Sequence, residues 1–120
     1  MSKITLFRRD ENPAEFKQGE TIFKEGDDAN VMYAVIEGSV ALYHNNALIN
    51  TLEADEIFGE MALCDNSPRS ASAVAATDCK LSVVDQQRFE FLVQQTPHFA
   101  VQVMSIMAAR LRDMTKLSTK

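Results

Sequence analysis

Short β-branched and aromatic segments fill the middle of the chain, and glycine, aspartate and asparagine separate them. The segments are residues 21–23, 31–36, 40–43 and 48–52, and a further pair, 71–76 and 81–84, around Thr77 and Asp78. Strands this short, at nearly even spacing, are typical of a β-roll or jelly-roll barrel. The pattern therefore predicts a mainly β fold with a barrel over about residues 16–84, whose mouth can hold one small ligand.

Local signals also predict one hairpin and two helices. Asn45-Asn46 favours a tight hairpin, because asparagine tolerates a positive φ. Asp85 is a good N-cap residue for a helix over 86–95. Thr96-Pro97 then predicts the start of a longer helix that reaches the last ten residues. We therefore expect C-terminal helices over about residues 85–117.

The run from Phe58 to Ala71, FGEMALCDNSPRSA, places the carboxylate of Glu60 nine positions before the guanidinium of Arg69. Gly59 frees the backbone to curl into a short helical turn, whose first N–H groups suit an anion. Arg69 adds a planar donor fork suited to phosphate. Glu60 would repel phosphate and needs donors, which ribose hydroxyls provide. Together they indicate a nucleotide with an exposed phosphate and a free 2′-hydroxyl.

An ion pair that only organises a loop is the alternative interpretation of Glu60 and Arg69, since isolated surface pairs are common. The small residues 70–73, which follow Arg69, argue against it. Small side chains let a ligand approach the backbone, whereas an ion pair does not need them.

The run resembles the phosphate-binding cassette of cyclic nucleotide-binding domains, whose pattern is F-G-E-hydrophobic-A-L, a short loop, then P-R-[ST/A]-A. Residues 16–27, FKQGETIFKEGD, are similar to the F-x-x-G-x-x-I-F-x-x-G-D opening of the family, and residues 32–40, MYAVIEGSV, to its next strand, turn and strand. The resemblance covers roughly residues 16–111. It implies a catabolite-activator-like β-roll (a double-stranded β-helix) with a short cassette helix. Asp55 departs from the family glycine at its position, but aspartate tolerates a left-handed backbone.

The resemblance also implies roles for individual residues. Arg69 would bind the cyclic phosphate and Glu60 the ribose 2′-hydroxyl, with backbone amides of the cassette in support. The Ser70 hydroxyl would add a contact to the phosphate or the base. The implied ligand-binding residues are Phe58, Gly59, Glu60, Met61, Ala62, Arg69, Ser70 and Ala71.

The function implied is that of a sensor or regulatory domain that binds cAMP or cGMP and signals by movement of its C-terminal helices to an effector protein that the sequence does not identify. Three alternatives stay open. The chain could be an interaction module that keeps the fold and does not bind the nucleotide, or a fragment of a larger transcription regulator of the catabolite-activator type. A small jelly-roll enzyme of the cupin type would need clustered histidines, which the chain lacks.

Composition and residue spacing argue against several classes of function. We expect one domain over residues 1–120, and a net charge of −5 argues against direct nucleic-acid binding. No long apolar run and no basic-then-apolar leader is present, so we expect no membrane contact and a cytoplasmic protein. Cys64, Cys79, His44 and His98 lack the spacing of metal or catalytic motifs. We therefore expect free thiols, no metal, no cofactor and no enzymatic activity.

The last helix has an apolar face with two interpretations. The face comprises Ala100, Val103, Met104, Met107, Leu111 and Met114. Packing on the barrel or over the ligand is the first interpretation. The alternating spacing of four and three also fits a coiled-coil seam and hence a homodimer, although only about two heptads are present.

Overall fold

The computed structural model describes residues 3–65 and 67–118, of which residues 114–118 are described by their backbone alone. The chain forms two units, a β unit over residues 3–86 and a helical unit over residues 87–118. No helix in the described ranges has the length and apolar character needed to cross a bilayer.

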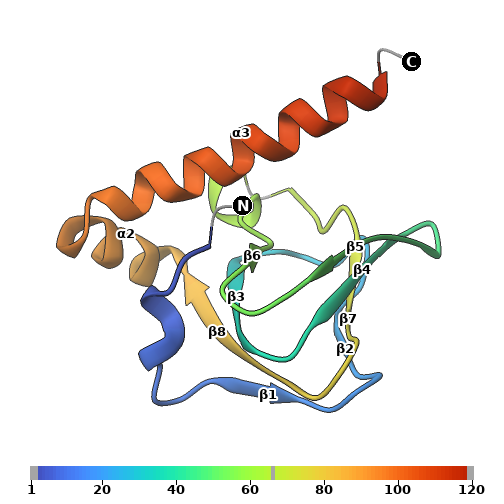
Figure 1. Cartoon of the computed structure of the whole chain (residues 1–120), viewed down its shortest axis with the longest axis horizontal. Helices are drawn as coiled ribbons and strands as arrows, with labels where there is room; N and C mark the ends of the chain where they lie inside the picture. The colour runs from blue at the N-terminus through green and yellow to red at the C-terminus, as the bar shows by residue number, and fades with distance from the viewer. Residues whose placement is uncertain (1–2, 66, 119–120) are drawn as a thin grey trace. The chain divides into compact units, whose positions relative to one another are not determined.

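Two four-stranded antiparallel sheets make up the β unit (Figure 1). In spatial order, the first sheet consists of β1 (Ala14–Phe16), β8 (Cys79–Asp85), β3 (Val31–Glu37) and β6 (Ile57–Phe58). The second consists of β2 (Thr21–Phe23), β7 (Ser72–Ala75), β4 (Val40–His44) and β5 (Ala47–Leu52). The predicted mainly β roll is confirmed, in the form of two sheets rather than one closed barrel.

One predicted strand pair is wrong. The segments 71–76 and 81–84 correspond to β7 and β8, but β7 pairs with β2 and β4, whereas β8 pairs with β1 and β3. The turn at Thr77 and Asp78 therefore carries the chain from one sheet to the other. A turn signal shows that the chain reverses and does not identify the strand beside which the next one lies.

The hairpin between β4 and β5 is confirmed. Asn45 and Asn46 have φ values of 51° and 66°, and His44 pairs with Ala47 across them. Two consecutive residues with positive φ match the twist of antiparallel strands. The asparagine pair therefore fixes where this sheet turns.

A core of small and medium apolar side chains lies in the β unit. Its buried members are Val35, Val40, Leu52, Phe58, Ala73, Ala75, Cys79 and Leu81. The partly buried side chains packed against it include Phe16, Phe23 and Tyr33. In β7 and β8 alternate residues contribute, as expected of strands with one face in the core. Phe23, Tyr33 and Phe58 carry this core up to the candidate site.

The first residues of the β unit are held to the rest of that unit through Asp55. The short 3-10 helix η1 (Leu6–Arg9) follows Ile4, whose N–H donates to the Asp55 carbonyl at 2.8 Å. Arg8 Nε donates to the Asp55 carboxylate at 2.9 Å, and Nη2 binds its other oxygen. Asp55 has a φ of 73°, as its left-handed tolerance predicted.

Two helices, α2 (Gln86–Gln95) and α3 (His98–Ser118), form the helical unit apart from the first residue of α2, which confirms the two predicted helices. Between them, the Phe99 N–H donates to the Thr96 carbonyl at 2.9 Å. The rings of Phe89 and Phe99 contact each other with centroids 5.3 Å apart. The predicted apolar face of the last helix lies on α3, except that the side chain of Met114 is outside the described residues. Its packing and a dimer seam stay predictions.

We predict that Asp55→Asn removes an acid-sensitive contribution to stability. The hydrogen bonds from Arg8 hold the pKa of Asp55 below its ordinary value. A lowered folded-state pKa means that the ion pair stabilises the fold above about pH 4 and that this stabilisation is lost as pH falls through the folded-state pKa. The free energy of unfolding, measured by urea titration, should therefore fall more between about pH 7 and pH 3 for the wild type than for Asp55→Asn.

Asn also tolerates a positive φ, so the variant changes the charge and leaves the backbone preference in place. Asp28→Asn, at an exposed carboxylate of the same unit, is the matched control and should follow the wild type. Equal pH dependence for the wild type and Asp55→Asn would contradict the assignment.

Candidate functional site

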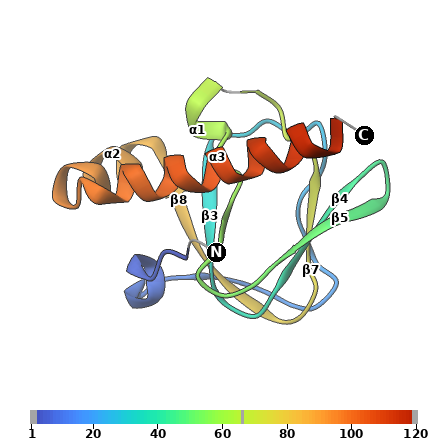
Figure 2. The same cartoon turned by 45° about the horizontal axis from the view of Figure 1, so that its top comes forward.

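The run FGEMALCDNSPRSA connects β6 to β7 through one helical turn. After Phe58 the chain curls at Gly59, and α1 (Ala62–Asp65) follows. The Ala62 N–H donates to the Gly59 carbonyl at 3.2 Å, and the Leu63 N–H donates to the Glu60 carbonyl at 3.1 Å. The predicted glycine-led helical turn is therefore confirmed. Figure 2 shows α1 at the end of the β unit where β3 begins.

Only glycine fits at position 59, because of the backbone conformation there and of the close contact with Arg69. Its φ is 76°, and a Cβ built there would lie 2.7 Å from Arg69 Nη1. A side chain at this position would be strained and would push the guanidinium away. The glycine thus lets Arg69 lie directly on the turn.

Both the backbone and the side chain of Arg69 are tied to other parts of the β unit. The Arg69 N–H donates to the Asp27 carbonyl at 2.9 Å, and the Gly26 N–H donates to the Arg69 carbonyl at 2.8 Å. Arg69 Nη2 donates to the Val31 carbonyl at 2.8 Å and Nη1 to the Gly59 carbonyl at 3.3 Å. Arg69 is only 7% exposed, and its Nε–H is buried without a hydrogen-bond partner among the described residues.

Aromatic rings complete the surroundings of the guanidinium. Arg69 Cζ lies 4.1 Å from the ring centroid of Phe23 and 5.7 Å from that of Tyr33. Phe23, Tyr33 and Phe58 also contact one another, with centroids 5.1–6.0 Å apart. Sequence reasoning missed Phe23, Tyr33 and Val31 as parts of the site. No local signal marks them, since in sequence they are ordinary apolar strand residues.

Burial and charge act on this group in opposite directions. Burial lowers the pKa of Arg69, whereas Tyr33 and the carboxylates of Asp27 and Glu60 raise it. Burial also raises the pKa of Tyr33. A guanidinium keeps its proton in proteins, so the site holds a buried positive charge at neutral pH.

The other predicted site residues fall into two groups. Glu60 is 7% exposed and Phe58 and Ala62 are buried, with the Phe58 ring in the core of the β unit. Met61 and Ser70 are exposed, and Ala71 is half-buried. The side chains of Phe58 and Ala62 therefore support the turn from inside, while Met61 and Ser70 face solvent.

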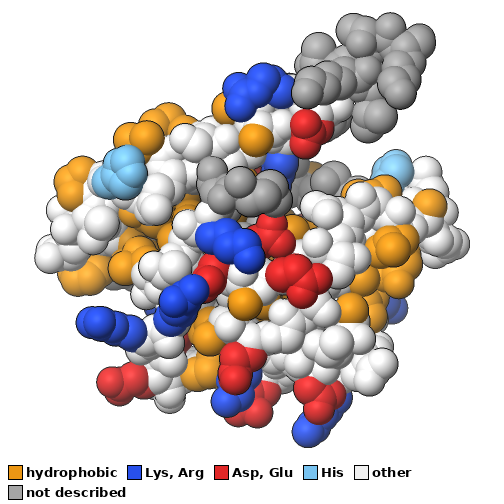
Figure 3. Space-filling view, viewed as in Figure 1, with side chains coloured by type: hydrophobic (Ala, Val, Ile, Leu, Met, Phe, Trp, Pro, Cys, Tyr) orange, Lys and Arg blue, Asp and Glu red, His pale blue; other side chains and the backbone are white. Residues whose placement is uncertain are grey.

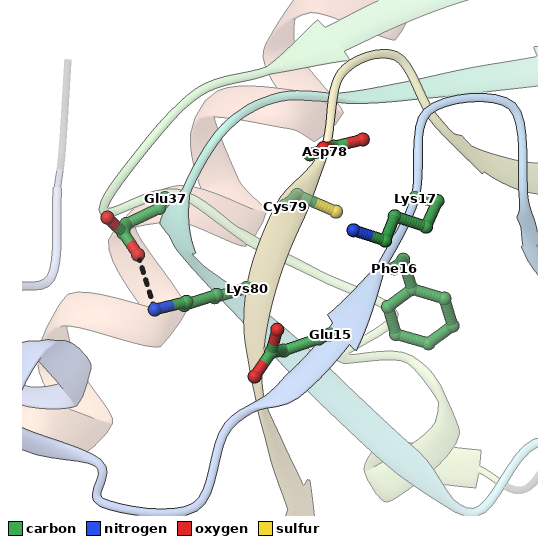
Figure 4. A pocket seen from close by; sticks show the side chains of 7 residues that line it. All are labelled: Glu15, Phe16, Lys17, Glu37, Asp78, Cys79 and Lys80. Carbon is green, nitrogen blue, oxygen red and sulfur yellow. Dashed lines mark ion pairs between the residues drawn. The ribbon is translucent and has the colours of Figure 1, made fainter.

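Two hollows lie on the β unit away from this turn. The first, about 390 Å³, is lined by residues 15–17, Glu37 and residues 78–80 (Figure 4). It mixes Lys17 and Lys80 with three carboxylates, and Lys80 pairs with Glu37 at 3.2 Å. The second, about 560 Å³, lies beside the β4–β5 hairpin. Neither is lined by Glu60 or Arg69, and no group of three metal-ligating side chains comes together in the described ranges.

The chain is similar in sequence to known proteins. The chain is 34% identical to the cyclic AMP receptor protein of Thermus thermophilus over 103 residues, which cover 82% of this chain and 48% of that protein. It is 40% identical to the cAMP-dependent protein kinase regulatory subunit of Debaryomyces hansenii over 85 residues, which cover 68% of this chain and 19% of that protein. The chain thus spans less than half the length of these relatives.

The fold matches as well. A crystal structure of the Thermus thermophilus catabolite activator protein superposes with a TM-score of 0.79 at 33% identity, over 87% of this chain and 51% of that one. The family described as "Cyclic nucleotide-binding domain" matches residues 13–96. The cassette run and the two sheets that position it lie inside that match. The chain therefore belongs to the cyclic nucleotide-binding domain family.

Proposed function

We propose that this chain binds a cyclic mononucleotide at the turn that carries Glu60 and Arg69. The observation that supports this most is the buried guanidinium of Arg69, which lies against Gly59 and has an unused Nε–H among the described residues. A cyclic phosphodiester supplies the negative charge and the acceptor oxygens that such a group can bind. Glu60, nearly buried on the same turn, is suited to accept hydrogen bonds from the ribose hydroxyl.

The charge distribution supports a local rather than an extended phosphate site. On the face of the β unit seen in Figure 3, acidic and basic side chains are interspersed and not gathered into a basic patch. The chain as a whole carries a net charge of −5. An extended nucleic-acid backbone needs many cations along its path, whereas one cyclic phosphodiester needs a single guanidinium.

The names of the relatives suggest two candidate bases, adenine and guanine. Two of the relatives are named for cAMP, and a 29% identical protein of Drosophila melanogaster is a cGMP-dependent protein kinase. Ser70 is compatible with either purine. We propose cAMP or cGMP as the ligand, and calorimetric titration with both nucleotides decides between them.

We predict that Arg69→Lys weakens cAMP binding by about 2–5 kcal/mol, because lysine keeps the charge but cannot present the planar fork. Isothermal titration of the purified variant measures the change. Arg69→Lys is preferred to Arg69→Ala, because the guanidinium also holds the Val31 and Gly59 carbonyls. Lys24→Ala, at an exposed cation of the same unit, is the control. Wild-type affinity in Arg69→Lys would refute the role.

We also propose that the ligand acts through the helical unit. A ligand shifts a protein between two arrangements only if it binds one of them more tightly. Hydrogen exchange in the presence and absence of cAMP measures this: we expect altered protection of backbone amides in residues 86–118. Exchange that changes only within residues 58–71 would leave binding in place and remove the signalling role.

A non-binding interaction module is the second candidate, and one observation favours it. One N–H of Nη1 and one of Nη2 bind carbonyls of the same unit, and the guanidinium lies over the Phe23 ring, so part of the group needed for phosphate is already in use. A thermal-shift screen with cAMP and cGMP separates the two candidates. Stabilisation by either nucleotide supports the sensor, and a melting temperature that no cyclic nucleotide changes supports the module.

A further inference from the structure

We propose that Arg69 is held in a latch from which a phosphate must take it, and that Phe23 sets how firmly the latch closes. The latch consists of Arg69 with the Val31 and Gly59 carbonyls and the Phe23 ring. This inference rests on the proposed function and adds to it the residue that tunes affinity at the same site.

The hydrogen bonds of the guanidinium show why it must move. A phosphate is bound best by two parallel N–H groups of one guanidinium edge. In the structure Nη2 is used by the Val31 carbonyl and Nη1 by the Gly59 carbonyl. Nε is unpaired within the described residues, but it is buried. Nη1 and Nη2 each keep a second N–H, but Arg69 is only 7% exposed, so no edge of the fork is accessible to a phosphate until the guanidinium leaves the latch.

The unpaired Nε–H favours a change of hydrogen-bond partners when a phosphate is present. A buried donor without a partner costs free energy, and each such group in a folded protein calls for an explanation. The carbonyls of Val31 and Gly59 and the aromatic rings stabilise the guanidinium, while Nε has no hydrogen-bond partner among the described residues. If Nε and Nη2 bound a phosphate together, Nε would gain a hydrogen-bond acceptor. The ligand would therefore remove the free-energy cost of the unpaired Nε–H.

Phe23 is the strongest ring contact of the latch. Its centroid lies 4.1 Å from Arg69 Cζ, against 5.7 Å for Tyr33. A cation over a ring is worth more when water is excluded, and Arg69 is 7% exposed. The contact stabilises the closed position, which makes Phe23 a positioning residue that opposes ligand binding.

The backbone of Arg69 limits the motion to its side chain. Two hydrogen bonds with Gly26 and Asp27, of 2.8 and 2.9 Å, hold the main chain in place. Opening of the latch therefore frees the carbonyl of Val31 at the start of β3 and the carbonyl of Gly59 next to Glu60. Binding would change both places at once without displacing the turn between them.

The test compares Phe23→Leu with Phe16→Leu by calorimetric titration with cAMP. Phe23→Leu removes the ring from the guanidinium, so we expect about 3- to 10-fold tighter binding than the wild type. Phe16→Leu makes the same change at a ring that packs against the same core and has no contact with Arg69 among the described interactions. It should bind cAMP within about twofold of the wild type.

A second measurement needs no ligand. In a ¹H–¹⁵N spectrum of the ligand-free wild type, the Arg69 Nε–H should exchange slowly and its proton should be displaced upfield by the ring current of Phe23. The displacement should vanish in Phe23→Leu and persist in Phe16→Leu. An Arg69 Nε–H signal in the wild type at the position and exchange rate of an exposed arginine would overturn the latch.

The outcomes separate the two proposals. Binding by the wild type with unchanged or weaker binding by Phe23→Leu overturns the latch and leaves the proposed function standing. Binding by Phe23→Leu with weak binding by the wild type supports both. No binding of cAMP or cGMP by the wild type, Phe23→Leu or Phe16→Leu overturns the proposed function and with it the role of the latch as a gate.

Discussion

The guanidinium of Arg69 joins three parts of the β unit that lie far apart in sequence. It donates to the Val31 carbonyl at the start of β3 and to the Gly59 carbonyl at the cassette turn, and it lies over the Phe23 ring at the end of β2. A buried charge is tolerated only where acceptors and neighbouring charges compensate for lost water. The turn, its glycine and the aromatic group of the core are all arranged around that requirement.

This requirement connects the fold to the function. The rings of Phe23, Tyr33 and Phe58 belong to the packing of the core, yet two of them also face the cation. The residue that recognises phosphate in the proposed function is therefore also a structural residue of the β unit. A ligand that bound the guanidinium would change the contacts of β3 and of the cassette turn together. Binding at the site would therefore affect other parts of the β unit.

The sequence predicted what is local and missed what is distant. The cassette turn, the Asn45-Asn46 hairpin and both helices follow from residues within a few positions of one another, and the structure has them. The Val31 acceptor is 38 positions from Arg69, so nothing near Arg69 in sequence could indicate it. β6 has two residues and is too short for an alternating pattern. The placement of β7 and β8 in different sheets depends on tertiary packing alone.

The most direct test of the central claim is a crystal structure of the chain grown with cAMP. The account predicts that both Nε and Nη2 of Arg69 bind the cyclic phosphate, that the Val31 carbonyl is released, and that Glu60 accepts a hydrogen bond from the ribose 2′-hydroxyl. A structure that contains cAMP elsewhere, with the guanidinium still on the Val31 and Gly59 carbonyls, would contradict it.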